Sequence, residues 1–408
     1  MSYPEAHLRF NSFQGARLHL GVCGSVAAFR ALDLLRHWQA CGVAVSATLT
    51  PSARRFVTSL SFEALGASPV YGDMYDAHAG PFAHLEAGQI AQAMVIAPVT
   101  ASTLARLAHG LADEMLACQA LAHQGTLVLA PAMNPRMWNH PATQASVALL
   151  TERGACFVMP ANGSVACGDE GQGKLADPRE IYLAGLKALS PQDMAGLCVM
   201  VTLGPTREQW DAARFWSNPS SGVMGASCAV AAWLRGAEVD AVCGPGSPWL
   251  PADIRRHNVV GARQMFDVAQ ALWPSAHYGV FTAAVADFSP EPYGSEKFKK
   301  TGAAKGFSLQ FTPNPDILQT LAARRRPDQK IVGFAAEASD DLGSAVRRKL
   351  RAKGADLVVG NRIGQEGAGF GVPTNVALAA DASGREEEWP LMLKTEVAWR
   401  ICSWLLRL

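Results

Sequence analysis

Short apolar runs alternate with helix-like segments along the whole chain. In the first half they are residues 17–23, 42–50, 93–97, 127–130 and 155–159, and in the second half residues 197–202, 236–245, 278–287 and 331–337. Continuous apolar runs of this length are typical of strands that are buried on both faces of a parallel sheet. The alternation predicts an α/β fold with two Rossmann-like domains, residues 1–190 and 191–408.

Small and hydroxyl-bearing residues gather where the first three runs end. Gly24 and Ser25 follow the first run, Thr50 ends the second, and Thr100 and Thr103 follow the third. Ligands of open α/β sheets bind beyond the carboxyl ends of the strands. A Gly-Ser step at a helix start also leaves backbone N–H groups free for a phosphate. These residues therefore predict a nucleotide-binding crevice.

The fourth run turns polar soon after Pro131. Asn134 follows within three residues, where it either contacts a ligand or closes an Asx-turn in a rigid loop, and this segment alone leaves both interpretations open. Further on, residues 163–173 contain four glycines and no periodicity, which predicts a mobile loop able to close over a site. Cys167 is an unusual residue for such a loop unless the chemistry needs a thiol.

Composition narrows the class of protein. The 408 residues carry a net charge of +1, with 49% hydrophobic and 17% charged residues, which argues against a protein that coats nucleic acid or a membrane. No apolar run reaches the length of a membrane span, and residues 1–16 are expected to form a loose extension without signal-peptide features. Nine cysteines without a C-x-x-C pair predict free thiols in a reducing cytoplasm and no structural zinc.

The motifs of residues 17–190 resemble the flavin-dependent cysteine decarboxylases, specifically the phosphopantothenoylcysteine decarboxylase family. The matching segments, in the family's order, are 25–29, His84, 98–103, 131–138 and 166–168. Ser102 departs from the pattern, since many members have asparagine there. The resemblance implies a flavodoxin-like flavoprotein domain that decarboxylates 4'-phosphopantothenoylcysteine to 4'-phosphopantetheine with FMN.

The same resemblance implies residue roles. His84, Asn134 and Cys167 would be catalytic, with the Cys167 thiol donating the proton of the final reduction. Taken alone, His84 would be an ordinary structural histidine, and only its place in the motif series suggests otherwise. The FMN-binding residues would be Gly24, Ser25, Thr50, Thr100 and Thr103.

Charged residues of the second half gather in a way that suits a nucleotide. Asp287 ends an apolar run, Lys297 lies in a basic loop, and Lys349 and Lys353 are four apart on one predicted helix face. A lysine run is by default a solvated surface, but together with an acidic metal ligand these lysines could neutralise a triphosphate. The lack of a G-x-x-x-x-G-K-[ST] loop excludes the commonest ATPase architecture without excluding nucleotide use.

Residues 197–400 resemble phosphopantothenate–cysteine ligase, which many bacteria fuse behind the decarboxylase, so the whole chain resembles that bifunctional enzyme of coenzyme A biosynthesis. The resemblance implies a parallel-sheet domain that joins cysteine to 4'-phosphopantothenate through an acyl-cytidylate, using CTP and Mg²⁺. Asn218 and Lys297 would be catalytic, and Asp287 would hold the metal. The implied CTP and substrate contacts are Arg214, Ala283, Asp287, Lys297, Asn314, Pro315, Asp316, Ile317, Phe334, Lys349 and Lys353.

Two residues of the second half depart from the ligase family's pattern, and the resemblance also implies an oligomeric state. Val223 stands where the family usually has lysine, and Pro313 stands where lysine often precedes Asn314. The resemblance also implies a cytoplasmic homo-oligomer built on trimers, such as a dodecamer, that acts on small molecules rather than on nucleic acid or membranes.

Two other functions fit parts of the sequence. Val223 and Ser102 are compatible with a flavoprotein that keeps only one activity or a regulatory or scaffold role. Two Rossmann-like halves are also compatible with a nicotinamide dehydrogenase. Flavin absorbance separates the dehydrogenase from the other two, and product formation from phosphopantothenate, cysteine and CTP separates the bifunctional enzyme from the scaffold.

Overall fold

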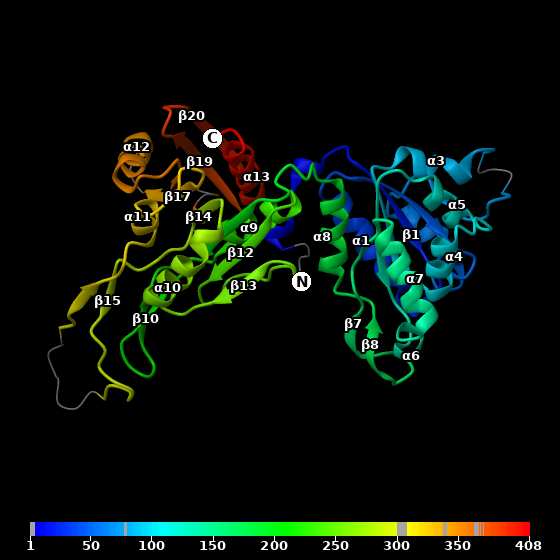
Figure 1. Cartoon of the computed structure of the whole chain (residues 1–408), viewed down its shortest axis with the longest axis horizontal. Coiled ribbons are helices and arrows are strands. Elements are labelled where there is room, and N and C mark those ends of the chain that lie inside the picture. The colour runs from blue at the N-terminus through cyan, green and yellow to red at the C-terminus, as the bar shows by residue number, and fades with distance from the viewer. Residues whose placement is uncertain are drawn as a thin grey trace. The chain divides into compact units, whose positions relative to one another are not determined.

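The chain forms two compact units. The computed structural model describes residues 5–76, 80–299, 308–337, 341–362, 367, 369 and 371–408. The first unit consists of residues 11–191, and the second of residues 5–10 and 192–408. Figure 1 labels the elements of each unit.

The first unit is built on a six-stranded parallel sheet. Its strands in chain order are β1 (Arg17–Val22), β2 (Ala44–Leu49), β3 (Val70–Tyr71), β4 (Ala93–Val99), β5 (Thr126–Pro131) and β6 (Cys156–Phe157). Their order across the sheet is β3-β2-β1-β4-β5-β6, and every pairing is parallel. This is a doubly wound, Rossmann-like sheet, and without the two-residue edge strand β3 it has the 2-1-3-4-5 order of flavodoxin-like proteins. The predicted fold class is confirmed.

Helices cover both faces of this sheet (Figure 1). Helices α1 (Arg30–Gln39) and α8 (Pro178–Leu189) pack together on one face, while α3 (Ala83–Ile90), α4 (Ala101–His109), α5 (Met115–Ala122) and α7 (Pro141–Glu152) pack on the other. The remaining elements are η2 (Asn11–Phe13), η3 (Val26–Phe29), η4 (Ala53–Arg55), α2 (Ser59–Ala64), α6 (Pro135–Trp138) and the hairpin β7 (Ala161–Ser164) and β8 (Glu170–Lys174). All of β4 and residues 128–131 of β5 are buried because both faces of the sheet are covered.

The second unit is built on an eight-stranded mixed sheet. In spatial order its strands are β13 (Arg255–Asn258), β12 (Glu238–Cys243), β9 (Cys198–Leu203), β14 (Tyr278–Phe281), β17 (Lys330–Glu337), β18 (Leu357–Arg362), β19 (Thr374–Asp381) and β20 (Glu386–Leu393). The first six pair in parallel, β19 pairs antiparallel to β18, and β20 pairs antiparallel to β19. The parallel strands bring their carboxyl ends to one edge, which is where a ligand is expected.

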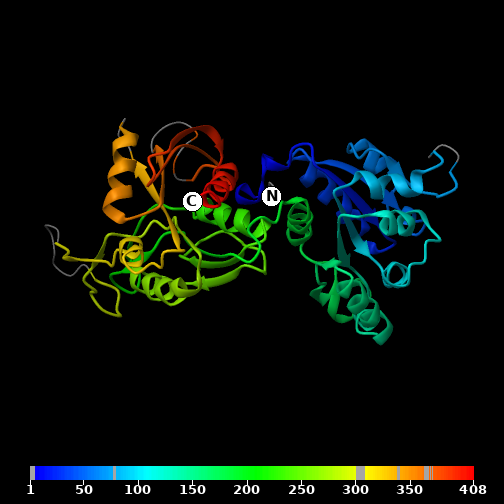
Figure 2. The same cartoon turned by 45° about the horizontal axis from the view of Figure 1, so that its top comes forward.

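Helices also pack against this second sheet (Figure 2). Helices α9 (Val223–Leu234) and α13 (Lys394–Leu405) pack against each other on one face, and α10 (Ala262–Leu272), α11 (Ile317–Ala322) and α12 (Leu342–Lys353) pack on the other. The short η5 (Trp273–Ser275) follows α10. Two small hairpins extend from the sheet: β10 (Arg207–Gln209) with β11 (Phe215–Ser217), and β15 (Phe288–Pro290) with β16 (Phe311–Pro313).

The first described residues belong to the second unit. The η1 turn (Ala6–Leu8) packs on α9 and α13, Leu8 and Phe10 are fully buried, and His7 Nε2 lies 2.7 Å from the Trp249 carbonyl oxygen. The prediction of a loose extension is therefore wrong for residues 5–13. Two isolated apolar residues gave no periodic signal, although their burial anchors the chain's start.

Candidate active sites

A cavity of about 710 Å³ opens at the carboxyl end of β5 in the first unit; we call it the N-terminal cavity. Its wall is mainly apolar and is formed by residues of three segments: 25–30 at η3, 132–134 after β5, and 161–178 around the β7–β8 hairpin. Of the residues that predicted a crevice at the strand ends, Ser25 lines this cavity, together with Asn134 and Cys167.

Asn134 has a structural role and a place in the cavity wall at the same time. Its Oδ1 accepts a hydrogen bond of 2.8 Å from the Arg136 backbone N–H and so caps α6. Its Nδ2 remains as a donor and bonds Asp169 Oδ2 at 2.6 Å and Cys167 Sγ at 3.1 Å. The turn-closing interpretation of Asn134 is therefore confirmed, and its contact with a ligand stays a prediction.

The glycine-rich segment forms the antiparallel hairpin β7–β8, with Cys167 in its exposed connection. The hairpin lies against the β5–α6 loop, where the Met133 N–H donates to the Gly173 carbonyl at 2.9 Å. A Cβ at Gly173 would collide with the Met133 carbonyl oxygen, which explains the glycine. The segment was expected to be an irregular loop, and its mobility stays a prediction.

Asp169 is a polar residue of this cluster that the sequence interpretation missed. Its carboxylate lies 3.7 Å from Cys167 Sγ and 3.5 Å from Arg136. The hydrogen bond from Asn134 and the positive charge of Arg136 hold the pKa of the Asp169 carboxyl below its usual range. The signal that could have found it is the acidic residue two positions after Cys167, in the same loop.

Other predicted residues of this half lie away from the cavity wall, Ser25 excepted. Thr50 Oγ1 accepts a hydrogen bond of 3.2 Å from the Ala53 N–H at the start of η4, and Thr100 caps α4. Thr103 is buried and accepts a hydrogen bond of 3.3 Å from the Cys23 thiol. A hydroxyl that follows a strand is also a natural helix cap or a buried hydrogen-bond partner, and these three side chains have such structural roles.

Gly24 and His84 have different surroundings. Gly24 lies so close to Ser52 that a Cβ would collide with it, which accounts for the glycine without a ligand. His84 is half-buried on α3 and is not among the residues of the N-terminal cavity. Both assignments stay predictions.

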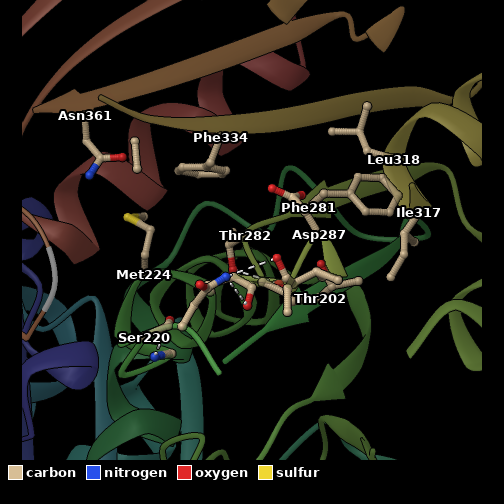
Figure 3. A pocket seen from close by; sticks show the side chains of 18 of the residues that line it. Thr202, Ser220, Met224, Phe281, Thr282, Asp287, Ile317, Leu318, Phe334 and Asn361 are labelled. Carbon is tan, nitrogen blue, oxygen red and sulfur yellow. Dashed lines mark hydrogen bonds between the residues drawn. The ribbon is translucent and has the colours of Figure 1, made fainter. Parts of the chain in front are cut away.

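A second cavity, of about 560 Å³, lies at the carboxyl ends of β9, β14, β17 and β18; we call it the C-terminal cavity (Figure 3). The segment after β14 forms much of its wall. Asn218 Nδ2 donates to the Ala284 and Val285 carbonyls at 3.3 and 3.1 Å, and Asn314 Nδ2 donates to the Ala286 carbonyl at 2.8 Å. These two amides fix the course of residues 284–286 along the cavity.

Acidic and basic groups meet in this wall. Asp287 is exposed, and its side chain has no hydrogen-bond partner in the described part of the chain. Asp316 caps α11 by accepting from the Gln319 N–H at 2.9 Å and also pairs with Lys353. Lys349 donates to the Phe334 carbonyl. The structure therefore brings Asp287 and two of the three predicted lysines to one cavity.

Most of the residues predicted to contact CTP or substrate in the second half line the C-terminal cavity, and two do not. Those that line the cavity are Asn218, Ala283, Asp287, Asn314, Pro315, Asp316, Ile317, Phe334, Lys349 and Lys353, together with Val223 at the first turn of α9. Lys297 is exposed and lies outside the wall. Arg214 also lies outside it, in a 2.7 Å ion pair with Asp211 and stacked over Trp210.

The comparisons with known proteins agree along the whole chain. Residues 11–187 match the flavoprotein family model, and residues 194–408 match that of the DNA/pantothenate metabolism flavoprotein C-terminal domain. The coenzyme A biosynthesis bifunctional protein CoaBC of Bacillus subtilis is 36% identical over 387 residues, which cover 94% of each chain. The CoaBC protein of Escherichia coli K12 is 36% identical over 89% of this chain and 90% of its own.

The chain belongs to the CoaBC family. It is a bifunctional flavoprotein of coenzyme A biosynthesis, with a decarboxylase and a ligase activity, and the predicted family and function are confirmed. Among solved structures, the C-terminal domain of a CoaBC protein is similar, with 30% identity, a TM-score of 0.44, and coverage of 52% of this chain and 94% of that one. Membership of the CoaBC family sets aside the dehydrogenase, and product formation remains the test that separates the bifunctional enzyme from a scaffold.

Two further observations concern metal and membrane. Within the described ranges, no group of three or more His, Cys, Asp and Glu side chains converges as a ready-made metal site. In that same part of the chain, every helix is too short or too polar to cross a membrane.

Proposed function

We propose that the C-terminal cavity ligates cysteine to 4'-phosphopantothenate with CTP, and that the N-terminal cavity decarboxylates the product with FMN. The domains would then be residues 1–190 for decarboxylation and 191–408 for ligation. The observation that carries the proposal is that each unit has a cavity at the carboxyl ends of its parallel strands, lined by residues suited to one of the two steps: Asn134 and Cys167 in the first, Asp287, Lys349 and Lys353 in the second.

The ligation needs an activated carboxylate. A carboxylate is a poor electrophile because it is already an anion, so CMP transfer from CTP supplies a leaving group and releases pyrophosphate. The amine of cysteine, after losing a proton to solvent, then attacks the acyl carbon. The new C–N bond forms, the bond to the cytidylate oxygen breaks, CMP leaves with the electron pair, and the second amine proton passes to solvent.

The wall of the C-terminal cavity fits the charges of this step. Lys349 and Lys353 would offset phosphate charge. Mg²⁺ is usually bound through one or two carboxylates together with substrate phosphates, and Asp287 is a carboxylate in the wall without a described partner. Asn218 would hold the acyl-cytidylate with its Oδ1, since its Nδ2 is used to fix residues 284 and 285. Lys297 and Arg214 would need a rearrangement or a second copy of the chain to take part.

The N-terminal cavity fits a flavin. Its volume lies within the range of roughly 300–1,000 Å³ of ligand pockets, and its apolar wall suits an aromatic ring system. Ser25 would hold the phosphate, and Val26 and Met133 would contact the rings. When bound, FMN would supply reversible hydride transfer at the cysteinyl group.

The chain's own residues would position the substrate and its proton. Asn134 Nδ2 would bind the substrate carboxylate in place of the Asp169 carboxylate that it contacts in this structure. Cys167 Sγ would hold the proton of the final reduction, 3.1 Å from that Nδ2. Asp169 would hold the thiol and the amide in place between turnovers.

The proposal extends to location and assembly. All nine cysteines are free, which supports a reducing cytoplasm. Val26 and Phe29 border the N-terminal cavity and are 61% and 50% exposed, which supports a homo-oligomer that covers this edge. The resemblance to the family implies that this assembly is built on trimers. The partners are small molecules: 4'-phosphopantothenate, cysteine and CTP.

Purified protein tests the proposal directly. The preparation should show flavin absorbance, and with 4'-phosphopantothenate, cysteine and CTP it should release pyrophosphate, CMP and CO2 and form 4'-phosphopantetheine. Product formation that does not depend on CTP would contradict the ligase assignment, and colourless protein that takes up no FMN would contradict the decarboxylase assignment.

A further inference from the structure

One end of the C-terminal cavity is formed by residues that the reaction above does not use. Asn361 lies near the end of β18, Asn375 near the start of β19, and Lys394 at the first position of α13. The antiparallel β18–β19 pairing sets Asn361 opposite Ala377, two residues from Asn375, and the Lys394 N–H donates to the Pro373 carbonyl at 3.0 Å. The topology thus brings all three to one corner of the sheet edge.

Figure 3 shows the cavity from this corner to its other end. Asn361, Met224 and Phe334 lie toward one side of the view, and Asp287 and Ile317 toward the other. We call the set Asn361, Asn375, Lys394, Met224 and Phe334 the Lys394 corner. It belongs to the same cavity as Asp287, Lys349 and Lys353. Its three polar members come from β18, β19 and α13, whereas the charged groups assigned to the nucleotide come from the segment after β14 and from α12.

Lys394 is a buried cation without a counter-ion. Its side chain is 4% exposed, and Nζ donates to the Gly369 carbonyl at 2.8 Å. No carboxylate in the described ranges pairs with it, so at most one of its three ammonium protons has a described acceptor. Burial lowers the pKa of Lys394 to about 8 because the charged form loses its hydration. Such a group is costly to keep unless an anion pairs with it at some stage.

Asn375 provides an unpaired hydrogen-bond acceptor, whereas Lys394 provides unpaired donors. It is 2% exposed, and its Oδ1 is buried without a hydrogen-bond donor among the described residues. Buried polar atoms are nearly always satisfied, and an exception in a cavity wall indicates a ligand or an ordered water. The missing group at this atom is a donor, and the missing group at Lys394 is an acceptor or an anion.

An α-amino acid carries both missing groups two bonds apart. Its carboxylate suits the Lys394 ammonium, and its amino group suits Asn375 Oδ1. A phosphate group fits less well, because it offers acceptors alone and would be repelled by the unpaired Oδ1. Met224 and Phe334 add a soft apolar surface that suits a thiol side chain.

We propose that the Lys394 corner is the binding subsite for the amino acid co-substrate, with Lys394 holding the carboxylate of cysteine and Asn375 Oδ1 its amino group. This rests on the proposed ligation in the C-terminal cavity. In this proposal, the amine of cysteine and the activated acyl group bind in the same cavity, and each is held by residues of different elements.

The test compares two substrates and separates two half-reactions. Cysteamine lacks the carboxylate of cysteine and keeps its amine and thiol. The wild-type protein should have a KM for cysteine well below that for cysteamine, and Lys394→Met should raise the cysteine KM about 10-fold or more while changing the cysteamine KM little. Lys330 begins β17, at the end of the strand away from the cavity. Lys330→Met is the matched control and should change neither the KM for cysteine nor the KM for cysteamine.

The first half-reaction reports on folding and on the proposed function. Pyrophosphate release from CTP and 4'-phosphopantothenate, measured without cysteine, should be the same in wild type and in Lys394→Met. If the wild type releases no pyrophosphate, the proposed ligase function fails. If it does, and Lys394→Met raises both amine KM values equally or raises the KM for 4'-phosphopantothenate instead, the amino acid subsite alone is overturned.

The second variant probes the amino end of the subsite. Asn375→Leu removes the buried Oδ1 at similar volume and should raise the KM for both amines about 5-fold or more, because both present the same amine. Unchanged KM values for both amines would overturn the assignment of Asn375.

Discussion

Replacing Asn134 by aspartate distinguishes the two functions of its side chain, the helix cap made by Oδ1 and the hydrogen bonds donated by Nδ2. The aspartate carboxylate can still accept the 2.8 Å bond from the Arg136 N–H, and an anion at a helix start is favourable, so α6 should keep its cap. The substitution removes both Nδ2 donors, to Asp169 and Cys167, and sets a carboxylate where the substrate carboxylate would bind. Decarboxylation should therefore fall while the fold and the bound flavin persist.

The expected magnitudes differ enough to be distinguished. Loss of a positioning group of this kind should lower decarboxylation about 100-fold, which corresponds to about 2.7 kcal/mol of transition-state stabilisation. Asn134→Ala loses the cap as well, at about 1 kcal/mol, or roughly 2–4 °C in melting temperature. Asn134→Asp should thus match Asn134→Ala in lost activity while keeping the cap, and any loss of stability in Asn134→Asp would come from its new carboxylate facing Asp169 in place of the 2.6 Å hydrogen bond.

The assay follows CO2 release from synthetic 4'-phosphopantothenoylcysteine, with flavin absorbance and melting temperature recorded on the same samples. Asn139→Asp makes the same change at the exposed other end of α6 and is the control. Asn134→Asp protein with more than about a tenth of wild-type activity would refute a substrate role for the amide. Loss of flavin from Asn134→Asp, with Asn139→Asp still yellow, would show that Asn134 serves cofactor binding or folding instead.

Three further predictions follow from the structure. Cys167→Ser should release CO2 yet accumulate an unsaturated enethiol product by mass spectrometry, because a hydroxyl is a weaker acid than a thiol, and a normal yield of saturated aminothiol would contradict the proton-donor role. Val223→Lys adds a cation at the first turn of α9 in the cavity wall and should lower the KM for CTP several-fold with kcat nearly unchanged, whereas a large rise in kcat would show a transition-state role. Because the pKa of Lys394 is about 8 in the folded protein and near 10.4 when unfolded, the unfolded state binds more protons between these values, so stability should rise with pH from about 8 to 10.4. In line with that sign, the free energy of unfolding at pH 7 should be higher in Lys394→Met than in the ligand-free wild type, by up to about 3 kcal/mol, and the difference should shrink toward pH 10. A lower melting temperature of Lys394→Met at pH 7 would contradict this.

The sequence predicted features that depend on local patterns. The apolar runs correspond to the central strands, and Asn134 and Asp287 lie at the strand ends where a parallel sheet places ligands. Thr50 and Thr103 show the limit of this reasoning, because a hydroxyl after a strand serves equally well as a helix cap or a buried partner.

Other features depend on tertiary contacts that have no local signal. Lys394 starts an amphipathic helix and looks like an ordinary solvated lysine in the sequence, and only its burial beside the β19 strand reveals it. Asn375 also has no distinguishing feature in the sequence, and only its buried, unpaired Oδ1 in the structure indicates a binding role. The η1 turn near the N-terminus packs onto helices more than 200 residues away in sequence, which no periodicity can foretell.

The central claim is that the two cavities carry successive steps of one conversion, and one experiment with two variants tests it most directly. Wild type, Asn134→Asp and Asp287→Asn are each given 4'-phosphopantothenate, cysteine, CTP and Mg²⁺, and the products are identified by mass spectrometry. The account predicts that wild type forms 4'-phosphopantetheine, that Asn134→Asp accumulates 4'-phosphopantothenoylcysteine, and that Asp287→Asn forms neither but still decarboxylates added 4'-phosphopantothenoylcysteine. If Asp287→Asn cannot decarboxylate the added compound, or Asn134→Asp accumulates no ligated intermediate, the assignment of one step to each cavity is contradicted.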